Sequence, residues 1–188
     1  MRSYKTEGII IKRVNFGEAD RVLTIYTKHY GKLRVIAKGV RRITSRRGGC
    51  LELFNLVTIF LAVGRNLDVV CEAELKESFP DIRKNLRKIA YAYFFGELVE
   101  GLCPERQENQ RVFELFYQEL KDLDKKEMIG EIKNIWMVRG IKDFTISLLK
   151  ELGYLVKDQD YQNFDIQKYL ENILQRKLKS ERVLNIIS

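Results

Sequence analysis

The sequence has little of the chemistry that enzymes and metal sites need. It contains one histidine, His29, and three cysteines, Cys50, Cys71 and Cys103, that lie far apart without a CxxC pair. His29 is expected in a turn beside Gly31, so neither a Ser–His–Asp nor a Cys–His arrangement can be built around it. No GxxxxGK[ST] or GxGxxG motif is present to bind the phosphates of a nucleotide. We therefore expect a protein that is not an enzyme and that holds no metal and no other cofactor.

Long hydrophobic runs are missing as well. The longest largely apolar stretch, Leu56 to Val63, is far shorter than the roughly 20 residues that a membrane-spanning helix needs. The first five residues, Met1 to Lys5, lead into an expected strand and not into the apolar core of a signal peptide. Scattered cysteines are typical of thiols in a reducing compartment. These features predict a soluble cytoplasmic protein, associated with the nucleoid if its partner is DNA.

Acidic residues are scarce in the first part of the chain. Residues 1–80 contain 15 Lys or Arg and 8 Asp or Glu, whereas residues 81–188 contain 19 and 18. Nearly all of the net charge of +8 therefore belongs to the N-terminal portion, where it would attract an acidic partner. Because these cations do not follow one face of an amphipathic helix, the pattern favours a nucleic acid over a membrane surface.

The spacing of apolar residues changes once along the chain. From Tyr4 to about Ser78 the period is two, with turn residues that divide this part into five short strands. Five short strands favour a small closed barrel over an open sandwich. Beyond Phe79 the period becomes 3.6 and predicts helices. We therefore expect the α+β class, with an all-β barrel in residues 1–79 and a helical bundle in residues 80–188. The expected strands are 8–14, 20–27, 33–37, 51–63 and 67–75, and the expected helices are 82–102, 112–120, 128–149, 166–174 and 181–187.

A basic loop between two expected strands is the main functional signal. Lys38 to Gly49 contains five cations and no acid, and it is too flexible to bury them. Such a loop on a small barrel suits a phosphate backbone, and aromatic rings beside it can stack on bases. The alternatives are a merely solvated loop and, for Phe16 and Tyr26, a place in the barrel core. The expected nucleic-acid-binding residues are Lys12, Arg13, Lys32, Arg34, Lys38, Arg41, Arg42, Arg46, Arg47, Arg65, Tyr26 and Tyr30.

An ordered series of segments resembles the RecO family of bacterial recombination mediators. The series comprises TEGIIIKR (6–13), GEADRVLT (17–24), GKLRVIAKGVRR (31–42), LELF (51–54), EAELKESF (72–79), LLKELGY (148–154) and LKS (178–180). The resemblance implies an N-terminal OB-fold, a helical second domain and a role without catalysis. It also implies binding to single- and double-stranded DNA, annealing of complementary strands, and recombinase loading together with RecR and single-stranded DNA-binding protein (SSB).

The resemblance also implies a site for the acidic, Phe-ended tail of SSB in the helical domain. Such a site needs an apolar pocket for the terminal ring and cations for the carboxylates. We expect Lys133, Arg139 and Lys142 to supply these cations. The chain departs from the family after the Leu-Gly-Tyr segment, where many members carry a four-cysteine zinc module. The positions of the first cysteine pair correspond to Tyr161 and Phe164, and the second pair is absent, so we expect apolar packing in place of the metal.

Two other functions remain open on the sequence. The same cations would suit an RNA- or ribosome-associated OB-fold protein, which a comparison of matched DNA and RNA strands would distinguish. A protein-interaction scaffold whose charge only provides solubility is the second alternative, and its binding would show little dependence on salt.

Overall fold

The computed structural model describes residues 2–45, 47–125, 132–161 and 164–180, and for residues 132–139 the backbone alone. The chain forms two compact units. One comprises residues 1–79 together with residues 103–113, and the other comprises residues 80–102 and 114–188. The expected boundary after residue 79 stays a prediction; the contacts within the chain group the segment 103–113 with the barrel.

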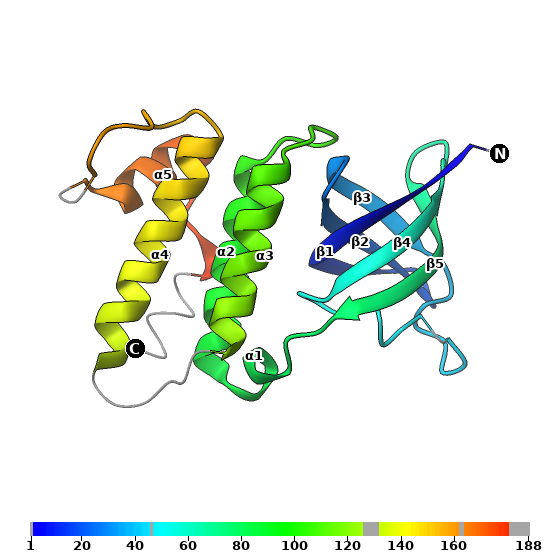
Figure 1. Ribbon diagram of the computed structural model, residues 1–188. Coiled ribbons are helices and arrows are strands. Elements are labelled where there is room, and N and C mark those ends of the chain that lie inside the picture. Colours follow the sequence, from blue (N-terminus) through cyan, green and yellow to red (C-terminus); the bar gives the residue numbers. More distant parts are fainter. Residues whose placement is uncertain (1, 46, 126–131, 162–163, 181–188) are drawn as a thin grey trace. The chain divides into compact units, whose positions relative to one another are not determined.

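Five strands form the first unit and close into a barrel in the order β1-β2-β3-β5-β4 (Figure 1). Neighbouring strands are antiparallel except β3 and β5, which run parallel. A closed five-stranded barrel followed by helices confirms the α+β class and the OB-like expectation. The strands are β1 (Ser3–Phe16), β2 (Asp20–Thr27), β3 (Gly31–Ala37), β4 (Leu56–Ala62) and β5 (Asp68–Glu77).

The barrel interior is filled by alternate apolar residues of every strand. Ile10, Leu23, Val35 and Ile59 are all fully buried in one core cluster. The long β1 pairs first with β4 and then with β2, and its register with β2 shifts between Ile10 and Lys12. Because a bulge reverses the alternation of side chains, the residues of β1 beyond the bulge face the opposite way from what a regular strand would give.

A segment outside the strands completes the barrel beside β3. Within the described residues, β5 begins opposite Val35, so the first part of β3 has no strand on that side. Residues 105 and 106 lie there instead: Lys32 forms a parallel bridge with Glu105, and the Lys32 carbonyl accepts a hydrogen bond of 2.9 Å from the Arg106 amide. The approach is so close that a Cβ atom on Gly31 would lie 1.9 Å from the Gln107 carbonyl oxygen.

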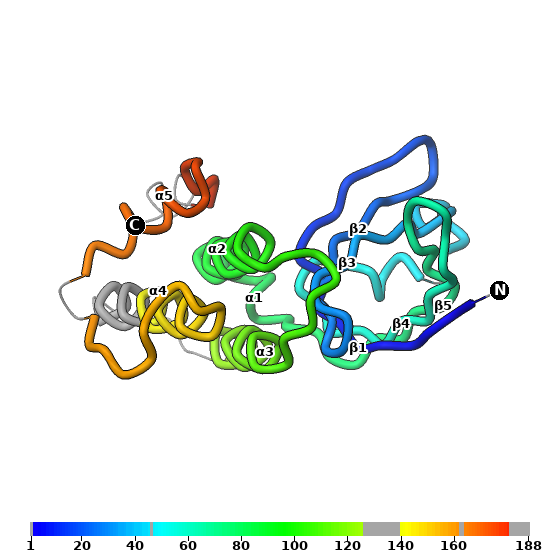
Figure 2. The backbone as a smooth tube through the Cα atoms, turned by 90° about the horizontal axis from the view of Figure 1, so that it is seen from above, coloured from blue at the N-terminus to red at the C-terminus, as the bar shows by residue number. Residues whose placement is uncertain are grey.

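The second unit is built from helices. Phe95, Phe116 and Phe144, from three different helices, share its core, with ring centroids 4.6 Å apart for Phe95 and Phe144 and 6.5 Å apart for Phe116 and Phe144. Figure 2 shows α2, α3 and α4 nearly end-on as neighbouring coils. Among the described residues, no helix combines the length and apolar character needed to cross a bilayer. The helices are α1 (Pro80–Lys84), α2 (Leu86–Leu102), α3 (Gln110–Lys125), α4 (Ile132–Glu151) and α5 (Ile166–Leu174).

Some expected elements differ from the observed ones. Of the expected strand 51–63, only β4 forms. Phe54, before β4, has a left-handed backbone with φ of 64°, which a strand does not allow. The expected helix 82–102 is divided in two at Asn85, whose side chain accepts hydrogen bonds from the amides of Arg87 and Lys88 and so begins α2. The expected helix 181–187 lies outside the described residues.

Candidate nucleic-acid interface

The basic loop between β3 and β4 is held beside the turn between β1 and β2. The Arg41 amide donates to the Ala19 carbonyl at 2.9 Å, and the Arg41 guanidinium donates to the Gly17 carbonyl at 3.2 Å. The Gly39 amide donates to the Asp20 carboxylate at 2.7 Å. Two connections that lie apart in sequence therefore form one end of the barrel, and the Arg41 and Arg42 side chains are exposed there.

Arg47 is held by the barrel itself. Its guanidinium donates to the carbonyls of Val70, Cys71 and Lys38 at 2.5, 3.2 and 2.9 Å. A half-buried guanidinium with three carbonyl acceptors fixes the loop to the start of β5. These contacts give Arg47 a structural role, and its expected contact with a phosphate stays a prediction. The expected residue Arg46 lies outside the described part of the chain.

Arg13 also departs from the expected role. Beyond the bulge it shares the inward register of Leu23, and it forms an ion pair with Glu52. Arg21 reaches the same carboxylate at 3.5 Å. Because Glu52 neutralises part of this charge, less of it is available to a phosphate, and the expected role of Arg13 stays a prediction.

The remaining expected cations lie in three places. Lys12 and Arg34 are exposed on opposite sides of Thr24, in a row that crosses β1, β2 and β3. Lys38, Arg41 and Arg42 extend from the basic loop, while the half-buried Lys32 lies one row further along β3. Arg65 is exposed in the turn after β4, and β4 ends beside the start of β1, away from the basic loop.

The two expected aromatic residues have different environments. Tyr26 is fully buried, its hydroxyl lies 3.5 Å from the Asn109 carbonyl, and burial raises its pKa well above the ordinary value. A wholly buried ring cannot stack on a base, so Tyr26 belongs to the protein interior. Tyr30 is 40% exposed and packs against Tyr4 at a centroid distance of 4.6 Å. Phe16, which could have been a core residue, is 57% exposed.

The face of the barrel formed by β4, β5 and the start of β1 carries charges of both signs, with the exposed Lys5 beside Phe60. Glu7 and Glu74 flank Thr58 on neighbouring strands, and Glu72 lies beside Phe60. Lys76 approaches Glu7 at 3.9 Å. This face has no excess of positive charge, whereas the end of β1 with β2, β3 and the basic loop has one and would attract phosphates. The excess positive charge of the barrel therefore lies mainly on one side of it.

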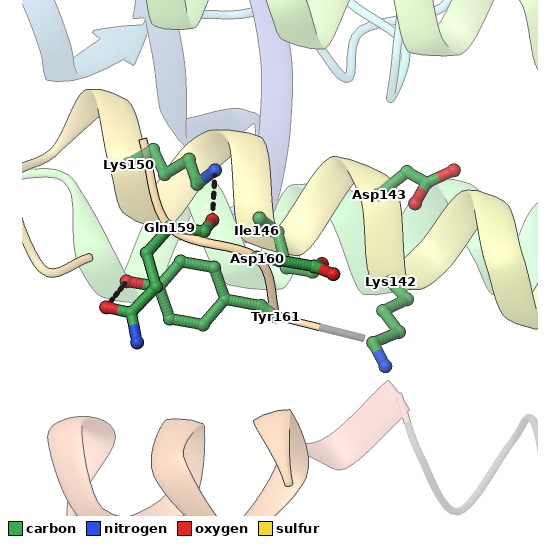
Figure 3. Close-up of a pocket in the computed structure, with 7 residues that line it drawn as sticks. All are labelled: Lys142, Asp143, Ile146, Lys150, Gln159, Asp160 and Tyr161. Atoms are coloured by element: carbon green, nitrogen blue, oxygen red, sulfur yellow. Dashed lines mark hydrogen bonds between the residues drawn. The ribbon is translucent and has the colours of Figure 1, made fainter. Parts of the chain in front are cut away.

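The helical unit contains one open cavity of interest in its described part (Figure 3). It has a volume of about 540 Å³ and is lined by Lys142, Asp143, Ile146, Lys150, Gln159, Asp160 and Tyr161. Of the three cations expected for an SSB tail, Lys142 borders this cavity, and the side chains of Lys133 and Arg139 lie outside the described residues. The Lys150 ammonium donates to the carbonyls of Lys157 and Gln159 at 2.8 and 3.0 Å.

The positions where relatives were expected to place the first cysteine pair carry packed aromatic rings. Tyr161 and Phe164 lie edge to face with centroids 5.4 Å apart, and Phe164 lies 5.1 Å from Tyr169. The Lys150 ammonium lies 5.2 Å from the centre of the Tyr161 ring. In the portion of the chain that the structure describes, no three His, Cys, Asp or Glu side chains gather where they could hold a metal ion.

Several surface residues of this interface were not identified from the sequence. Val14 and Val22 face outward on neighbouring strands, and Val22 is in register with Ile36 on β3. A regular alternation would place Val14 on the same face as Ile10, inside the barrel. The bulge in β1 leaves no clear signal in the sequence, so only the structure identifies these side chains as surface residues.

Comparison with known proteins gives consistent matches along most of the chain. The family model Recombination protein O N terminal matches residues 1–79, and Recombination protein O C terminal matches residues 83–157. A curated protein from Roseiflexus sp. (strain RS-1), named DNA repair protein RecO, is 38% identical over 153 residues, which are 81% of this chain and 51% of the relative. A protein of the same name from Acetivibrio thermocellus is 34% identical over 154 residues, 82% of this chain and 59% of the relative. The chain spans about half the length of these relatives.

Proposed function

We propose, from the premise that this chain belongs to the RecO family of DNA repair proteins, that it is a DNA-binding recombination mediator without catalytic activity. In this proposal the barrel binds single- and double-stranded DNA and anneals complementary strands. Together with a RecR-like partner, the protein helps to load recombinase onto gaps that SSB covers. The relatives' name supports the role in repair, and the exposed cations of the barrel support the contact with DNA.

The division of charge on the barrel is the observation that carries this proposal. Lys12, Arg34, Lys38, Arg41 and Arg42 are exposed on one side, whereas on another face Glu7, Glu72 and Glu74 are mixed with Lys5 and Lys76. A charged strand would therefore bind along a defined path. Cations that neutralise phosphates release counterions, which gives affinity without selecting a base sequence. Annealing needs this kind of contact, because two complementary strands of any sequence must approach each other against their mutual repulsion.

A charge-reversal experiment tests the DNA contact. Arg41→Glu with Arg42→Glu should weaken binding to a labelled single strand by about tenfold to a hundredfold, because both guanidinium groups are exposed and outside the core. Lys168→Glu with Lys177→Glu changes the net charge equally in the helical unit, where both side chains are also exposed, and serves as the control. Fluorescence anisotropy at several salt concentrations should show a slope that is shallower by about 0.7 for each lost phosphate contact.

The outcomes separate three possibilities. Equal weakening by both pairs would show that only net charge matters, and unchanged affinity in the Arg41 and Arg42 variant would place the DNA elsewhere. Tighter binding to a matched RNA strand than to DNA would favour the RNA- or ribosome-associated alternative. An annealing assay with free and SSB-coated strands then tests the mediator role.

The cavity of the helical unit supports a second partner, the acidic tail of SSB. Ile146 and Tyr161 supply apolar surface there, and Lys142 lies at its border. Asp143 and Asp160 also line the cavity, so an acidic tail would have to place its carboxylates toward Lys142. Anisotropy with a labelled tail peptide, and with the same peptide lacking its final Phe, tests this site. Loss of binding on removal of Phe and in Lys142→Glu supports the site, whereas equal binding of both peptides contradicts it.

A further inference from the structure

An apolar strip crosses the cationic side of the barrel. Val14 on β1 lies directly opposite Val22 on β2, and Val22 lies opposite Ile36 on β3. Val14 is 51% exposed, while Val22 and Ile36 are partly exposed. Phe16, two residues beyond Val14 on the same face of β1, is 57% exposed. We call these four residues the apolar strip.

The outward direction of the strip follows from the bulge in β1. Before the bulge, Ile10 faces the core, and after it Arg13 takes the inward register beside Leu23. Val14 and Phe16 must then point away from the core. Bulges re-aim side chains in this way near functional surfaces, and here the bulge exposes two large apolar groups that a regular strand would bury.

Cations lie on both sides of the apolar strip. Lys12 and Arg34 are exposed in the adjacent row, two residues back along β1 and β3. On the other side lies the basic loop, whose Arg41 guanidinium donates to the Gly17 carbonyl one residue after Phe16. The two sets of cations therefore border an apolar surface, and neither set lies on the face with Glu72 and Glu74. Asp20, opposite Phe16 on β2, accepts a hydrogen bond from the Gly39 amide of the basic loop.

An apolar strip bordered by cations would bind an unpaired strand and a duplex differently. A duplex presents phosphates outward and keeps its base faces stacked inside, so it gains nothing from an apolar surface. An unpaired strand can place phosphates on the bordering cations, stack a base on the Phe16 ring and lay other bases against the aliphatic side chains, and such contacts tolerate any sequence. We propose that the apolar strip is the base-binding platform of the barrel and gives it a preference for single-stranded over double-stranded DNA. This inference rests on the proposed DNA-binding function and specifies the form of DNA that the site selects.

A pair of matched double variants tests the platform. Val14→Ser with Phe16→Ser removes the two most exposed groups of the strip, and Val63→Ser with Phe60→Ser removes the same two residue types elsewhere on the barrel, where they are 42% and 37% exposed. We expect the first variant to lose about tenfold or more in affinity for an oligothymidine strand. Its affinity for a duplex of equal length and its salt slope should stay within twofold of the wild type. The control variant should bind both forms normally.

A ring-retaining variant separates stacking from general damage. Phe16→Trp should keep the wild-type affinity for the oligothymidine strand, and its added fluorescence should be quenched by that strand and not by the duplex. Unchanged single-strand affinity in the Val14 and Phe16 variant, or an equal loss for strand and duplex, would overturn the platform while leaving DNA binding itself intact. If the wild type bound neither form of DNA, the proposed function would fail instead.

Discussion

Gly31 shows how a single residue fixes the closure of the barrel. It begins β3 with φ of +60°, and the backbone of Gln107 occupies the space where a side chain would be. Nearby, the buried Asp68 carboxylate accepts hydrogen bonds from Tyr4 at 2.6 Å and Arg106 at 3.0 Å. Burial alone would raise the pKa of Asp68, but these donors and the Gly64 amide lower it. The segment 103–113 is therefore held to the barrel by close backbone packing and by an ion pair.

We predict that Gly31→Ala is much more destabilising than Gly17→Ala. Both glycines have positive φ, +60° and +56°, but no atom lies within 4 Å of a Cβ on Gly17. Gly17→Ala should therefore lower the free energy of unfolding by only about 1 kcal/mol, the cost of the left-handed backbone. Gly31→Ala should cost roughly 3 kcal/mol or more, because backbone atoms must also move. Urea unfolding of both variants measures the difference, and equal costs would show that Gln107 does not press on β3.

The sequence predicted the exposure of the basic loop better than the surroundings of the individual residues assigned to the candidate site. The basic loop and its exposed Arg41 and Arg42 follow from composition alone, because a loop has no interior in which to place five charges. Arg47 and Tyr26 were assigned by residue type, yet one is bound by carbonyls and the other is buried beneath the segment around Asn109. Such roles depend on contacts between distant parts of the chain, which spacing does not reveal.

At the scale of the elements, Glu97 of α2 forms hydrogen bonds with the segment that follows α5. Its carboxylate accepts hydrogen bonds from the Arg176 guanidinium at 2.5 Å, the Lys179 amide at 2.9 Å, and the Ser180 amide and hydroxyl at 2.8 and 2.6 Å. Burial alone would raise the pKa of Glu97, but these donors lower it to about 2. The ionised carboxylate thus connects two helical segments of the second unit that are far apart in sequence.

This connection predicts a pH-dependent contribution to stability. Because the pKa of Glu97 is lower in the folded than in the unfolded chain, its contribution is fully present above about pH 4.5 and is lost as the pH falls toward 2. Glu97→Gln should lower the free energy of unfolding by about 1–3 kcal/mol near neutral pH. The difference from the wild type should shrink below about pH 4. Glu74→Gln, an exposed residue of β5, is the control, and a difference that stays constant with pH would contradict the role of Glu97.

The elements differ in how far the sequence predicted them. β2 and α5 match their expected ranges because a segment rich in strand-forming residues and a helical stripe are bounded by clear turn and capping residues, such as Asp165 before α5. Strand β4 is shorter than expected because Leu51 and Phe54 are buried through turns and not through a strand. Apolar residues predict burial, but they do not by themselves specify the backbone that achieves it.

At the scale of the whole molecule, one change of period was sufficient to predict a barrel followed by helices. The association of residues 103–113 with the barrel was not predictable, since its contacts include a backbone hydrogen bond and an ion pair of Arg106 and the approach of Glu108 to His29, none of which follows a local pattern. The strand pairing beside β3 therefore includes a segment that is separated from β5 by two helices. Backbone groups of β3 that have no neighbouring strand need other hydrogen-bond partners, and this segment provides them.

The last prediction concerns whether the folded molecule needs a metal. Tyr161 is buried, and its hydroxyl accepts a hydrogen bond of 3.0 Å from the Val156 amide. Its ring contacts Phe164 and the Lys150 ammonium, so side-chain packing holds the chain together where a zinc module would use thiolates. We expect the purified protein to contain no stoichiometric zinc and to keep its melting temperature in a chelator.

Two variants make this expectation specific to Tyr161. Tyr161→Ala should lower the free energy of unfolding by roughly 2 kcal/mol or more, because it removes a buried ring and its contacts. Tyr161→Phe keeps the ring and should lose only about 1 kcal/mol with the hydroxyl. Neither effect should change when zinc is added during refolding. A metal analysis that found about one zinc per chain, or a chelator that lowered the melting temperature of the wild type, would mean that a metal stabilises this part of the molecule after all.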